Sequence, residues 1–480
     1  MPDKTLLRNF VNGEFVDPAE GGFTDVVDPA TGEVYASAPR STAPDVDAAF
    51  SAASAAFAEW KRTTPAERQA ALLAMADTVE QAAGRLVEAE ARNTGKPVGL
   101  TTSEEIPPMV DQIRFFAGAA RILEGRSSGE YMRGYQSSVR REPVGVVGSV
   151  TPWNYPMMMA VWKFAPALAA GNTIVLKPSD TTPASTVLLA ELFADLLPPG
   201  VFNVVCGDRS TGALLAAHPT PAMVSITGST RAGKAVATAA APNVTRTHLE
   251  LGGKAPCVVF ADADLAAAAE GIAVAGYFNA GQDCTAATRV LVHESVAGDL
   301  VAALAEQAAG VRLSRDEDDS EDLFIPPVNN PTQLAHVSGL VERAPAHASI
   351  VTGGAAAPGS GYFYAPTIVD GLRAGDELVR TEIFGPVITV QTFADEEEAV
   401  RLANDSDYGL ASSVWTTSHT TALRASAAID AGCVWINCHI PLVAEMPHGG
   451  FKQSGYGKDL SAYSLEDYTR VKHVMSFVGE

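Results

Sequence analysis

Short apolar runs rich in valine and isoleucine alternate with longer alanine-rich segments from about residue 143 onward, and this alternation constrains the fold more than any other feature of the chain. The short runs have the length and composition of buried strands, and the longer segments have helical periodicity interrupted by proline and glycine. The predicted strands are 144–150, 173–176, 202–205 and 223–226, and the predicted helices are 183–197 and 210–218. Strands that alternate with helices form a parallel, doubly wound sheet, which binds ligands at the carboxyl ends of its strands.

The alternation resumes between about residues 256 and 430 and predicts a second α/β domain. Its predicted strands are 257–260, 290–293 and 387–390. A predicted helix, 265–278, leads toward Cys284, and the acidic run 315–322 predicts a solvated loop. A chain of 480 residues is also too long for a single hydrophobic core, so more than one domain is expected from its length.

The net charge of −22 argues against nucleic acid or an anionic membrane as a partner, because phosphates would be repelled over the whole approach. Small molecules and other proteins remain. The chain has no stretch of about 18 uninterrupted apolar residues, as a membrane span requires, and its first residues lack the apolar core of a secretory signal. Its five cysteines are scattered without CxxC spacing. A cytoplasmic protein without a metal site is therefore expected.

Cys284 lies among small and polar residues in segment 279–289, where a substrate can approach its sulfur. A thiol attacks a carbonyl carbon well only as the thiolate, and little of an ordinary thiol is ionised near neutral pH, so the site must activate it. Glu250 lies upstream, before a glycine pair, and can accept a proton from the thiol or from an attacking water. The alternative is a buried structural cysteine beside a turn.

A lysine and an aspartate follow the predicted strand 173–176 at the entry to a helix. The Asp180 carboxylate can accept hydrogen bonds from the hydroxyls of a ribose and would repel a 2′-phosphate, so it favours NAD over NADP. Lys177 can donate a hydrogen bond to the same sugar. Taken alone, the pair is equally typical of a solvated surface.

Glycine and hydroxyl residues follow two other predicted strands. Segment 227–230 contains Gly228 and Ser229 and precedes a predicted helix, where free backbone N–H groups favour a pyrophosphate. An ordinary N-cap explains the same residues. Gly207 and Gly212 resemble a loosened glycine-rich turn without the full G-x-G-x-x-G pattern, which is a weak signal by itself.

Glu382 and Phe384 stand two residues apart before a Gly-Pro turn. Residues at this spacing share one face of an extended segment. Glu382 can then hold a second ribose while Phe384 packs on a nicotinamide ring. The alternative is a turn with a buried phenylalanine.

Six motifs, taken together and in their order along the chain, resemble the aldehyde dehydrogenase superfamily. They are 152–156 (PWNYP), 177–180 (KPSD), 227–230 (TGST), 250–254 (ELGGK), 281–284 (GQDC) and 382–386 (EIFGP). The resemblance extends from residues 10–14 to residues 468–472. Within the superfamily the chain is most similar to bacterial γ-aminobutyraldehyde dehydrogenases and the related betaine aldehyde dehydrogenases. This narrower likeness is carried by segments 115–121, 277–284, 445–450 and 454–459.

The resemblance implies a mechanism for each catalytic position. Cys284 attacks the aldehyde to form a thiohemiacetal, whose oxyanion is held by the side-chain amide of Asn154 and the backbone N–H of Cys284. Such preorganised donors contribute about 3 to 4 kcal/mol each. Hydride transfer to NAD leaves a thioester, and Glu250 activates the water that hydrolyses it. Lys163 and Asp459 resemble the family's buried proton-relay pair, although aspartate is shorter than the glutamate often found there.

The resemblance also implies an NAD site made from several loops. Its members are Trp153, Lys177, Ser179, Asp180, Gly207, Gly212, Gly228, Ser229, Leu251, Glu382 and Phe384. The implied architecture has a Rossmann-type NAD-binding domain (1–121 and 142–248), a second α/β catalytic domain (249–448) and a β arm. Segments 122–141 and 455–480 would bridge subunits of a homodimer or homotetramer.

Aromatic residues flank the reactive motifs and predict a box for a cationic aldehyde. The rings of Tyr155, Trp162 and Phe278 can attract an ammonium group by about 0.5 to 2 kcal/mol per contact, unless they are plain core aromatics. His448 is assigned to the same pocket. Asp283, next to the nucleophile, can attract the ω-ammonium group of a substrate by about 1 to 4 kcal/mol at roughly 4 Å. It would also raise the pKa of the thiol, so it should face the substrate or pair elsewhere.

The predicted reaction is oxidation of a short aminoaldehyde such as 4-aminobutanal to the amino acid. Betaine aldehyde or a broad range of aldehydes are alternatives that the same box admits. Succinic semialdehyde is disfavoured because no arginine accompanies the nucleophile, and CoA acylation because Glu250 activates water. A non-catalytic protein with this fold would be expected to lack Cys284, Asn154 or Glu250. Glu105 and Asp111, near the presumed mouth of the substrate tunnel, can add negative potential there, but a solvated helix face is the prediction for both.

Overall fold

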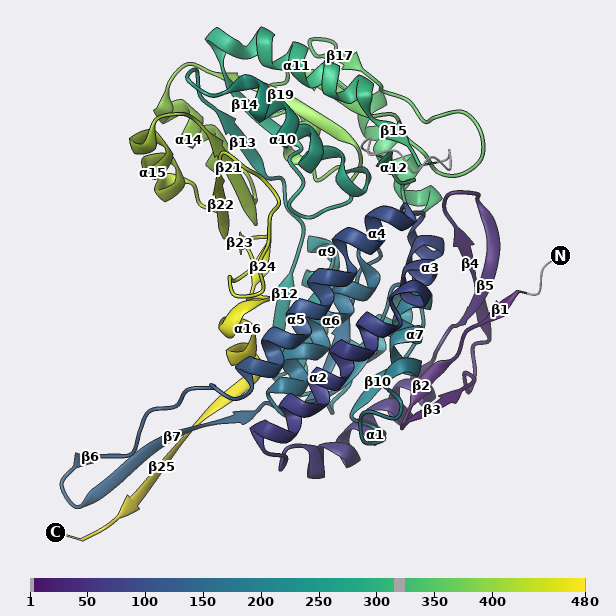
Figure 1. Cartoon of the computed structure of the whole chain (residues 1–480), viewed down its shortest axis with the longest axis vertical. Helices are drawn as coiled ribbons and strands as arrows, with labels where there is room; N and C mark the ends of the chain where they lie inside the picture. The colour runs from purple at the N-terminus through teal and green to yellow at the C-terminus, as the bar shows by residue number, and fades with distance from the viewer. Residues whose placement is uncertain (1–3, 315–323, 480) are drawn as a thin grey trace.

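The computed structural model describes residues 4–314 and 324–479, so the acidic run 315–322 lies outside the described residues. Two lobes, each with a central sheet, lie one above the other, and a long β arm projects from the first lobe (Figure 1). Within the described residues, no helix is both long and apolar enough to cross a membrane.

The first lobe is built on an eight-stranded sheet. In spatial order its strands are β24 (Gly455–Tyr456), β12 (Arg246–Glu250), β11 (Met223–Thr227), β8 (Val146–Val150), β9 (Thr173–Lys177), β10 (Phe202–Val204), β2 (Asn9–Val11) and β3 (Glu14–Val16). The central strands from β12 to β10 are parallel, as the alternating pattern predicts. The chain leaves β8 toward β9 and later returns to build β11 on its other side. The strand order therefore reverses between β8 and β11, which is where ligands bind in such sheets.

Helices cover both faces of this sheet. They are α1 (Ala43–Trp60), α2 (Pro65–Gln81), α3 (Ala83–Thr94), α4 (Val98–Glu104), α5 (Ile106–Ala119), α6 (Pro156–Ala169), α7 (Ala184–Phe193), α8 (Arg209–Ala217), α9 (Thr230–Ala240) and α16 (Ser461–Asp467). Adjacent strand residues contribute to opposite cores: Val147 packs with α2, α5, α6 and α7, whereas Val146 packs with α1, α8 and α9. This alternation follows from the two-residue period of a strand, and it explains why the strands are apolar throughout.

The second lobe has a seven-stranded sheet. Its order is β17 (Ser349–Thr352), β18 (Thr367–Asp370), β19 (Val387–Phe393), β14 (Arg289–His293), β13 (Pro256–Val259), β21 (Ala411–Trp415) and β22 (Cys433–Ile436). Its helices are α10 (Leu265–Tyr277), α11 (Ala297–Gly310), α12 (Pro331–Glu342), α13 (Glu377–Arg380), α14 (Glu396–Asn404) and α15 (His419–Ala428). All strand pairs are parallel except β17 with β18. The predicted α/β fold class is confirmed.

Besides the arm, the described chain has three small sheets. They are β1 (Thr5–Leu6) with β5 (Glu33–Pro39) and β4 (Phe23–Asp28), β15 (Arg312–Leu313) with β16 (Phe324–Ile325), and β20 (Tyr408–Gly409) with β23 (Phe451–Lys452). The first of these lies near the N-terminus, at the side of the first lobe opposite the arm (Figure 1).

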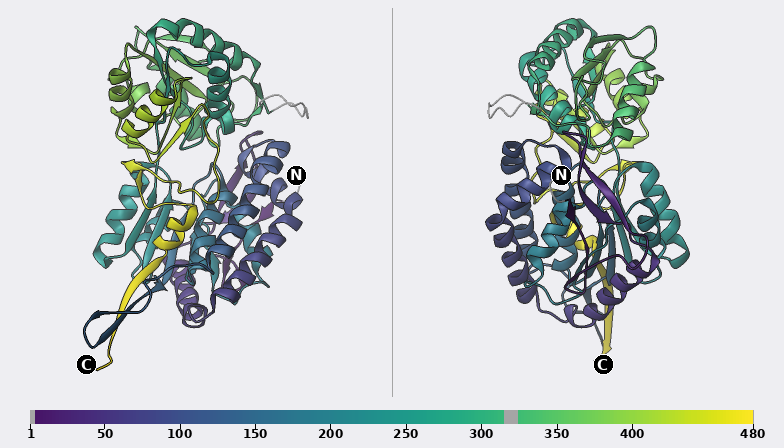
Figure 2. Two further views of the ribbon diagram at one scale, coloured as in Figure 1. Left: turned by 60° about the vertical axis from the view of Figure 1, so that its left-hand side comes forward. Right: turned by 90° about the vertical axis from the view of Figure 1, so that its right-hand side faces the viewer.

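The arm consists of β6 (Gly129–Met132), β7 (Tyr135–Pro143) and β25 (Thr469–Phe477). The last strand of the chain, β25, pairs antiparallel with β7 along its whole length, so segments far apart in sequence form one ribbon (Figure 2). Residues 455–468, which the sequence places with the bridging segments, lie instead in the first lobe. There β24 pairs with β12, and α16 packs beside α6.

Candidate active site

The predicted catalytic and cofactor residues converge where the two lobes meet. In the first sheet, Asn154 follows β8, Lys177 ends β9 and Glu250 ends β12, so all three lie at the carboxyl edge. The second lobe contributes loops that enter the amino ends of its strands, with Cys284 before β14 and Glu382 before β19. Hydrogen bonds join the two sides: the Asn154 Nδ2 atom donates to the backbone carbonyl of Gln282 over 2.9 Å.

The loop before Cys284 has an unusual backbone. Asn279, Ala280 and Gly281 all have positive φ angles, of 50°, 56° and 65°. For residues other than glycine this conformation costs of order 1 kcal/mol or more each, and it persists only where the surroundings enforce it. Here the buried Asn279 side chain donates to the Asn154 carbonyl over 2.9 Å. The distorted turn therefore links the nucleophile's loop to the residue predicted to hold the oxyanion.

Gly253 provides the second restraint on this loop. A Cβ at Gly253 would lie 2.2 Å from the backbone oxygen of Cys284, so only glycine permits this approach. The Gly253 N–H also donates to the Glu382 carboxylate over 2.9 Å. The glycine pair after Glu250 thus lets three chain segments meet at the nucleophile.

Cys284 is half-buried, and its surroundings disfavour the thiolate. Burial raises the pKa of the Cys284 thiol well above its usual value, and the carboxylates of Asp283, Glu250 and Glu382 raise it further. Since the thiolate is the reactive form, its fraction increases as the pH rises toward this raised pKa. A nearby base or a positively charged ligand is needed to ionise the thiol near neutral pH.

Asn154 is buried in the same site as Cys284, and one of its amide N–H donors is free among the residues that the structure describes. One of its two amide hydrogens bonds the Gln282 carbonyl, and the other is left for a ligand. Its Oδ1 atom has no hydrogen-bond partner within the described part of the chain. A preorganised donor in a dry site stabilises a developing oxyanion more than water would.

Glu250 is nearly inaccessible, with 3% of its surface exposed. Burial raises the pKa of its carboxyl well above the usual value, and the Asp459 charge raises it further, while Lys163 lowers it. Its Oε2 atom lies 4.0 Å from Nε2 of His448, and its Oε1 atom has no hydrogen-bond partner within the described chain. A carboxylate held in this way is a strong base for a water molecule.

The predicted relay pair is brought together. The Lys163 Nζ atom lies 2.6 Å from Oδ2 of Asp459, and both side chains are fully buried. Burial works against the charged carboxylate, but Lys163 and His248 hold the pKa of Asp459 down at about 2. The backbones of Asp459 and His448 exchange two hydrogen bonds of 2.8 Å, which places the pair beside Glu250.

Lys177, at the end of β9, donates hydrogen bonds from its ammonium group to the protein's own backbone. Its Nζ atom donates to the backbone carbonyls of Pro178 and Gly207, over 2.7 and 2.6 Å. Gly207 and Gly212 therefore both lie beside Lys177. A Cβ at Gly207 would lie 2.1 Å from the Thr211 side chain, so this glycine is needed for packing. Ser179 and Asp180 remain accessible at the same edge.

At the end of β11, Ser229 caps α9, its Oγ atom accepting from the Ala232 N–H over 3.3 Å. The N-cap explanation therefore holds, and Gly228 lies next to it with no atom closer than 3.7 Å to a Cβ built there. The Leu251 side chain was also predicted as a cofactor contact. It is buried in the core against Gly233, because α9 packs directly over it.

The rings of Trp153 and Phe384 meet edge to face, with centroids 5.2 Å apart. Beside them, burial raises the pKa of Glu382 to about 7. Burial also lowers the pKa of Lys254 to about 7, and its Nζ atom has no hydrogen-bond partner in the described structure. Lys254 ends the motif 250–254 (ELGGK), yet no pattern in the sequence indicated that its ammonium group would be buried here.

The predicted aromatic box forms one cluster. Tyr155 and Trp162 are buried together, and the half-buried Phe278 packs against them. His448 joins this group, its ring 5.2 Å from that of Trp162. Asp283 uses one carboxylate oxygen to accept from the Thr285 N–H and hydroxyl, over 2.7 and 2.6 Å. No cation pairs with Asp283 among residues 4–314 and 324–479.

This geometry can be compared with known proteins. Residues 15–474 match the model of the family described as "Aldehyde dehydrogenase family". The chain belongs to the aldehyde dehydrogenase family. Three solved structures support the fold of this aldehyde dehydrogenase. A putative aldehyde dehydrogenase from Burkholderia cenocepacia is 38% identical, with a TM-score of 0.95 over 98% of this chain and 97% of that one.

The other two structures are of an NAD-dependent enzyme and of an enzyme in complex with NAD+. An NAD-dependent aldehyde dehydrogenase from Sinorhizobium meliloti is 38% identical, with a TM-score of 0.95 over 100% of this chain and 96% of that one. Betaine aldehyde dehydrogenase from Staphylococcus aureus in complex with NAD+ is 34% identical, with a TM-score of 0.95 over 98% and 95% of the two chains.

A buried charge cluster behind the aromatic box was missed from the sequence. The Lys96 Nζ atom lies 2.6 Å from Glu105 and 3.9 Å from Glu90, and 4.1 Å from the Tyr155 ring centroid. The prediction of a solvated Glu105 is wrong, because the junction of α4 and α5 turns this side chain inward to Lys96, leaving it 2% exposed. Asp111 is exposed, as predicted.

Proposed function

We propose that this aldehyde dehydrogenase uses NAD to oxidise a short ω-aminoaldehyde, such as 4-aminobutanal, to the corresponding amino acid. The observation that carries this proposal is the Asp283 carboxylate, which has no cationic partner in the described structure, beside Cys284 and the aromatic cluster. The reaction takes place in the cytoplasm, where the five free cysteines stay reduced.

The residues present fit NAD. Asp180 is accessible at the end of β9 to accept hydrogen bonds from a ribose, and the start of α9 presents backbone N–H groups to a pyrophosphate. Glu382 would meet the second ribose, and the rings of Trp153 and Phe384 would hold the nicotinamide. Bound NAD supplies a hydride acceptor. Two of the matched proteins are described as NAD-dependent or as bound to NAD+.

The chain's own residues then perform an acyl transfer. Cys284 loses its proton and forms a carbon–sulfur bond to the aldehyde carbon, while Asn154 donates a hydrogen bond to the resulting oxyanion. After the hydride leaves, the acyl group remains on Cys284 as a thioester. Glu250 removes a proton from water as its oxygen bonds the acyl carbon, and the carbon–sulfur bond breaks to release the acid.

A primary ammonium group suits Asp283 for two reasons. It bears a positive charge, and it can donate hydrogen bonds to the carboxylate oxygen that Thr285 does not use. The Asp283 charge also contributes to the raised pKa values of Cys284 and Tyr155. A cationic substrate that covered Asp283 would relieve this effect on the thiol.

Betaine aldehyde is the second candidate, favoured by the similarity to the Staphylococcus aureus enzyme. Its trimethylammonium group would be attracted by the same charge and rings but cannot donate a hydrogen bond to Asp283. A side-by-side measurement of kcat/KM for the two aldehydes on the purified enzyme separates these candidates.

Asp283→Asn is expected to lower kcat/KM for 4-aminobutanal by about tenfold relative to butanal, because the Coulomb attraction is lost while the shape is kept. Asp111→Asn is a matched control, since Asp111 is also acidic but exposed on α5. An unchanged ratio of the two aldehydes in Asp283→Asn would show that the charge does not select the substrate.

Asp180→Ser is expected to raise kcat/KM with NADP by about tenfold relative to NAD, because the carboxylate that repels a 2′-phosphate is removed. Asp180→Glu keeps the charge and should keep the NAD preference. The two cofactors are compared at saturating aldehyde. If Asp180→Ser kept the cofactor ratio of the unmodified enzyme, Asp180 would not meet the ribose.

We also propose that the arm joins subunits of a homodimer or homotetramer. The arm exposes large apolar side chains that isolated soluble chains normally bury. Tyr131 on β6 is 62% exposed, and Val471 and Phe477 on β25 are 64% and 66% exposed. Burying such residues against a second copy is the simplest way to remove them from water.

A further inference from the structure

We propose that His248 and Asp467 form the exit through which protons leave the buried active site for solvent. This inference rests on the proposed function, since it concerns the hydrolytic half of that reaction. It extends the Lys163–Asp459 pair by two residues that join it to a surface pocket.

The proposed reaction requires such an exit. One aldehyde, one NAD+ and one water give one carboxylate, one NADH and two protons. The first proton is the one that the Cys284 thiol loses when its sulfur bonds the aldehyde carbon, and the second comes from the attacking water through Glu250. Glu250 is only 3% exposed, so its proton must pass through other groups before the next turnover.

Strand β12 directs two side chains along one route. His248 and Glu250 lie two residues apart on this strand, so both point to the same face of the sheet. Glu250 ends the strand at the active site, and His248 lies one step back toward the base of the arm. The Lys163–Asp459 pair lies at this face, since Oδ1 of Asp459 is 3.4 Å from Nε2 of His248.

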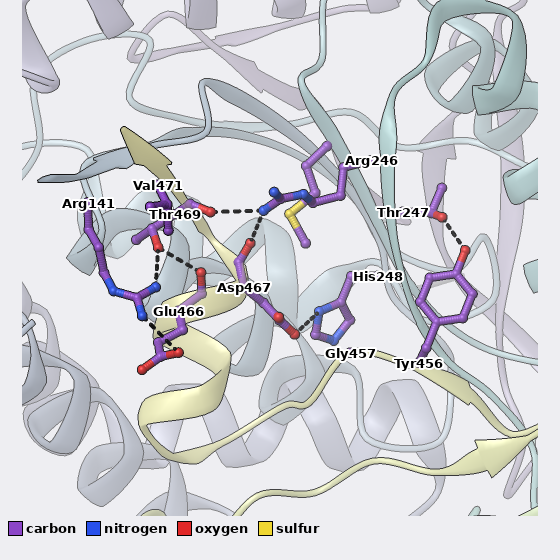
Figure 3. A pocket seen from close by; sticks show the side chains of 11 residues that line it. Arg141, Arg246, Thr247, His248, Tyr456, Gly457, Glu466, Asp467, Thr469 and Val471 are labelled. Carbon is purple, nitrogen blue, oxygen red and sulfur yellow. Dashed lines mark hydrogen bonds and ion pairs between the residues drawn. The ribbon is translucent and has the colours of Figure 1, made fainter. Parts of the chain in front are cut away.

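Asp459 bridges the pair to His248. One oxygen, Oδ2, accepts from Lys163 over 2.6 Å, whereas the other, Oδ1, lies 3.4 Å from Nε2 of His248. On its other side, the His248 Nδ1 atom lies 3.5 Å from Oδ2 of Asp467. Figure 3 shows the His248 ring and the Asp467 carboxylate pointing toward each other. The imidazole is thus placed between two carboxylates.

Asp467 opens this route to solvent. Its side chain is 40% exposed, whereas that of His248 is 1% exposed. Both line a pocket of about 430 Å³ at the base of the arm, with Tyr456 and Gly457 on its wall (Figure 3). A Cβ at Gly457 would lie 2.7 Å from Nδ1 of His248, so the glycine makes room for the ring.

A structural role alone does not account for His248. A buried histidine that only supports the fold normally has its ring nitrogens hydrogen-bonded. Here neither nitrogen makes a well-formed hydrogen bond in the described chain, and the carboxylates of Asp459 and Asp467 stand 3.4 and 3.5 Å away. Both separations slightly exceed a direct bond, and small shifts of either carboxylate close them, as is common in catalytic sites before ligands bind.

The charges that face His248 suit a proton carrier. Burial lowers the pKa of the imidazole, but the carboxylates of Asp459 and Asp467 raise it more, while Lys163 lowers it. The Tyr468 ring lies 6.0 Å away on the remaining side. The pKa is raised overall, so the ring binds a proton more readily than an ordinary imidazole does.

Each transfer conserves protons. A proton that reaches Oδ1 of Asp459 passes to Nε2 of His248, and the imidazolium gives its Nδ1 proton to Asp467. The exposed Asp467 releases that proton to water in the pocket. The ring is left protonated at Nε2, and a water-mediated shift of that proton to Nδ1 restores the first tautomer.

The test compares His248→Gln and Asp467→Asn with the unmodified full-length enzyme, using 4-aminobutanal and butanal. Stopped-flow absorbance follows NADH, and a pH indicator in weak buffer follows proton release. We expect the first NADH turnover to keep its rate, while steady-state turnover falls about tenfold in His248→Gln, because hydrolysis follows hydride transfer. Proton release should lag behind NADH, and added imidazole should restore part of the rate.

Tyr456→Phe is the matched control, because Tyr456 lines the same pocket but bonds Thr247 rather than His248. It should keep both rates. Unchanged turnover and proton release in both His248→Gln and Asp467→Asn would overturn the proposal. Equal loss of the first NADH turnover in His248→Gln, without imidazole rescue, would also overturn it and show a supporting role. Absence of NADH from the unmodified enzyme would instead reject the proposed function.

Discussion

Cys284→Ser is expected to lower kcat/KM for aldehyde oxidation by about 10³-fold or more, because a serine hydroxyl is far harder to ionise than a thiol. The surroundings increase this effect. Burial and three nearby carboxylates already raise the pKa of the thiol, and they would disfavour an alkoxide as well. The measurement is the initial rate of NADH formation with saturating NAD and varied aldehyde.

Cys433→Ser is the matched control for this substitution. Cys433 is also a free, half-buried cysteine, but it lies at the start of β22. It should retain nearly full activity. NAD binding by Cys284→Ser, followed by protein fluorescence, should remain intact and show that the fold is preserved. Activity within a few-fold of the unmodified enzyme in Cys284→Ser would disprove the role of Cys284 as nucleophile.

Glu250→Gln is expected to separate the two halves of the reaction. Hydride transfer should still give one NADH per active site, whereas hydrolysis should slow by about 10²- to 10⁴-fold because the base is gone. The acyl group would then remain on Cys284, where intact-protein mass spectrometry detects it after mixing with aldehyde and NAD.

The same substitution has a pH signature. A base must lose its proton to act, so turnover in the unmodified enzyme should rise as the pH increases through the raised pKa of Glu250. Glu250→Gln should lose this dependence in the hydrolytic step. Steady turnover at the normal rate, with no acyl adduct on Cys284, would rule out Glu250 as the base for water.

The central strands of the first sheet could be predicted from sequence because they are buried on both faces. β8, β9 and β11 read as short apolar runs, and their carboxyl ends then located Asn154 and Lys177. Local patterns of this kind depend on a few neighbouring residues. Glu250 was identified instead from the glycine pair that follows it and from the family motif, and the strand that it ends, β12, was not predicted.

The contacts between buried charged side chains could not be predicted in this way. Glu105 turns inward because α4 and α5 meet at that residue, and its partner Lys96 lies in the preceding loop. The approach of Asp459 to His248 depends on β24 pairing with β12. No periodic pattern in the sequence indicates either contact. The two-residue spacing of His248 and Glu250 was visible, but the carboxylates around His248 were not.

The C-terminal strand has a practical consequence for work with this enzyme. β25 begins at Thr469, two residues after Asp467. The Arg246 side chain donates hydrogen bonds to the backbone carbonyls of both residues, over 2.9 Å each. An affinity tag on the C-terminus would therefore be attached to a strand that is anchored beside Asp467. The N-terminus lies away from the arm, and a purification tag belongs there (Figure 1).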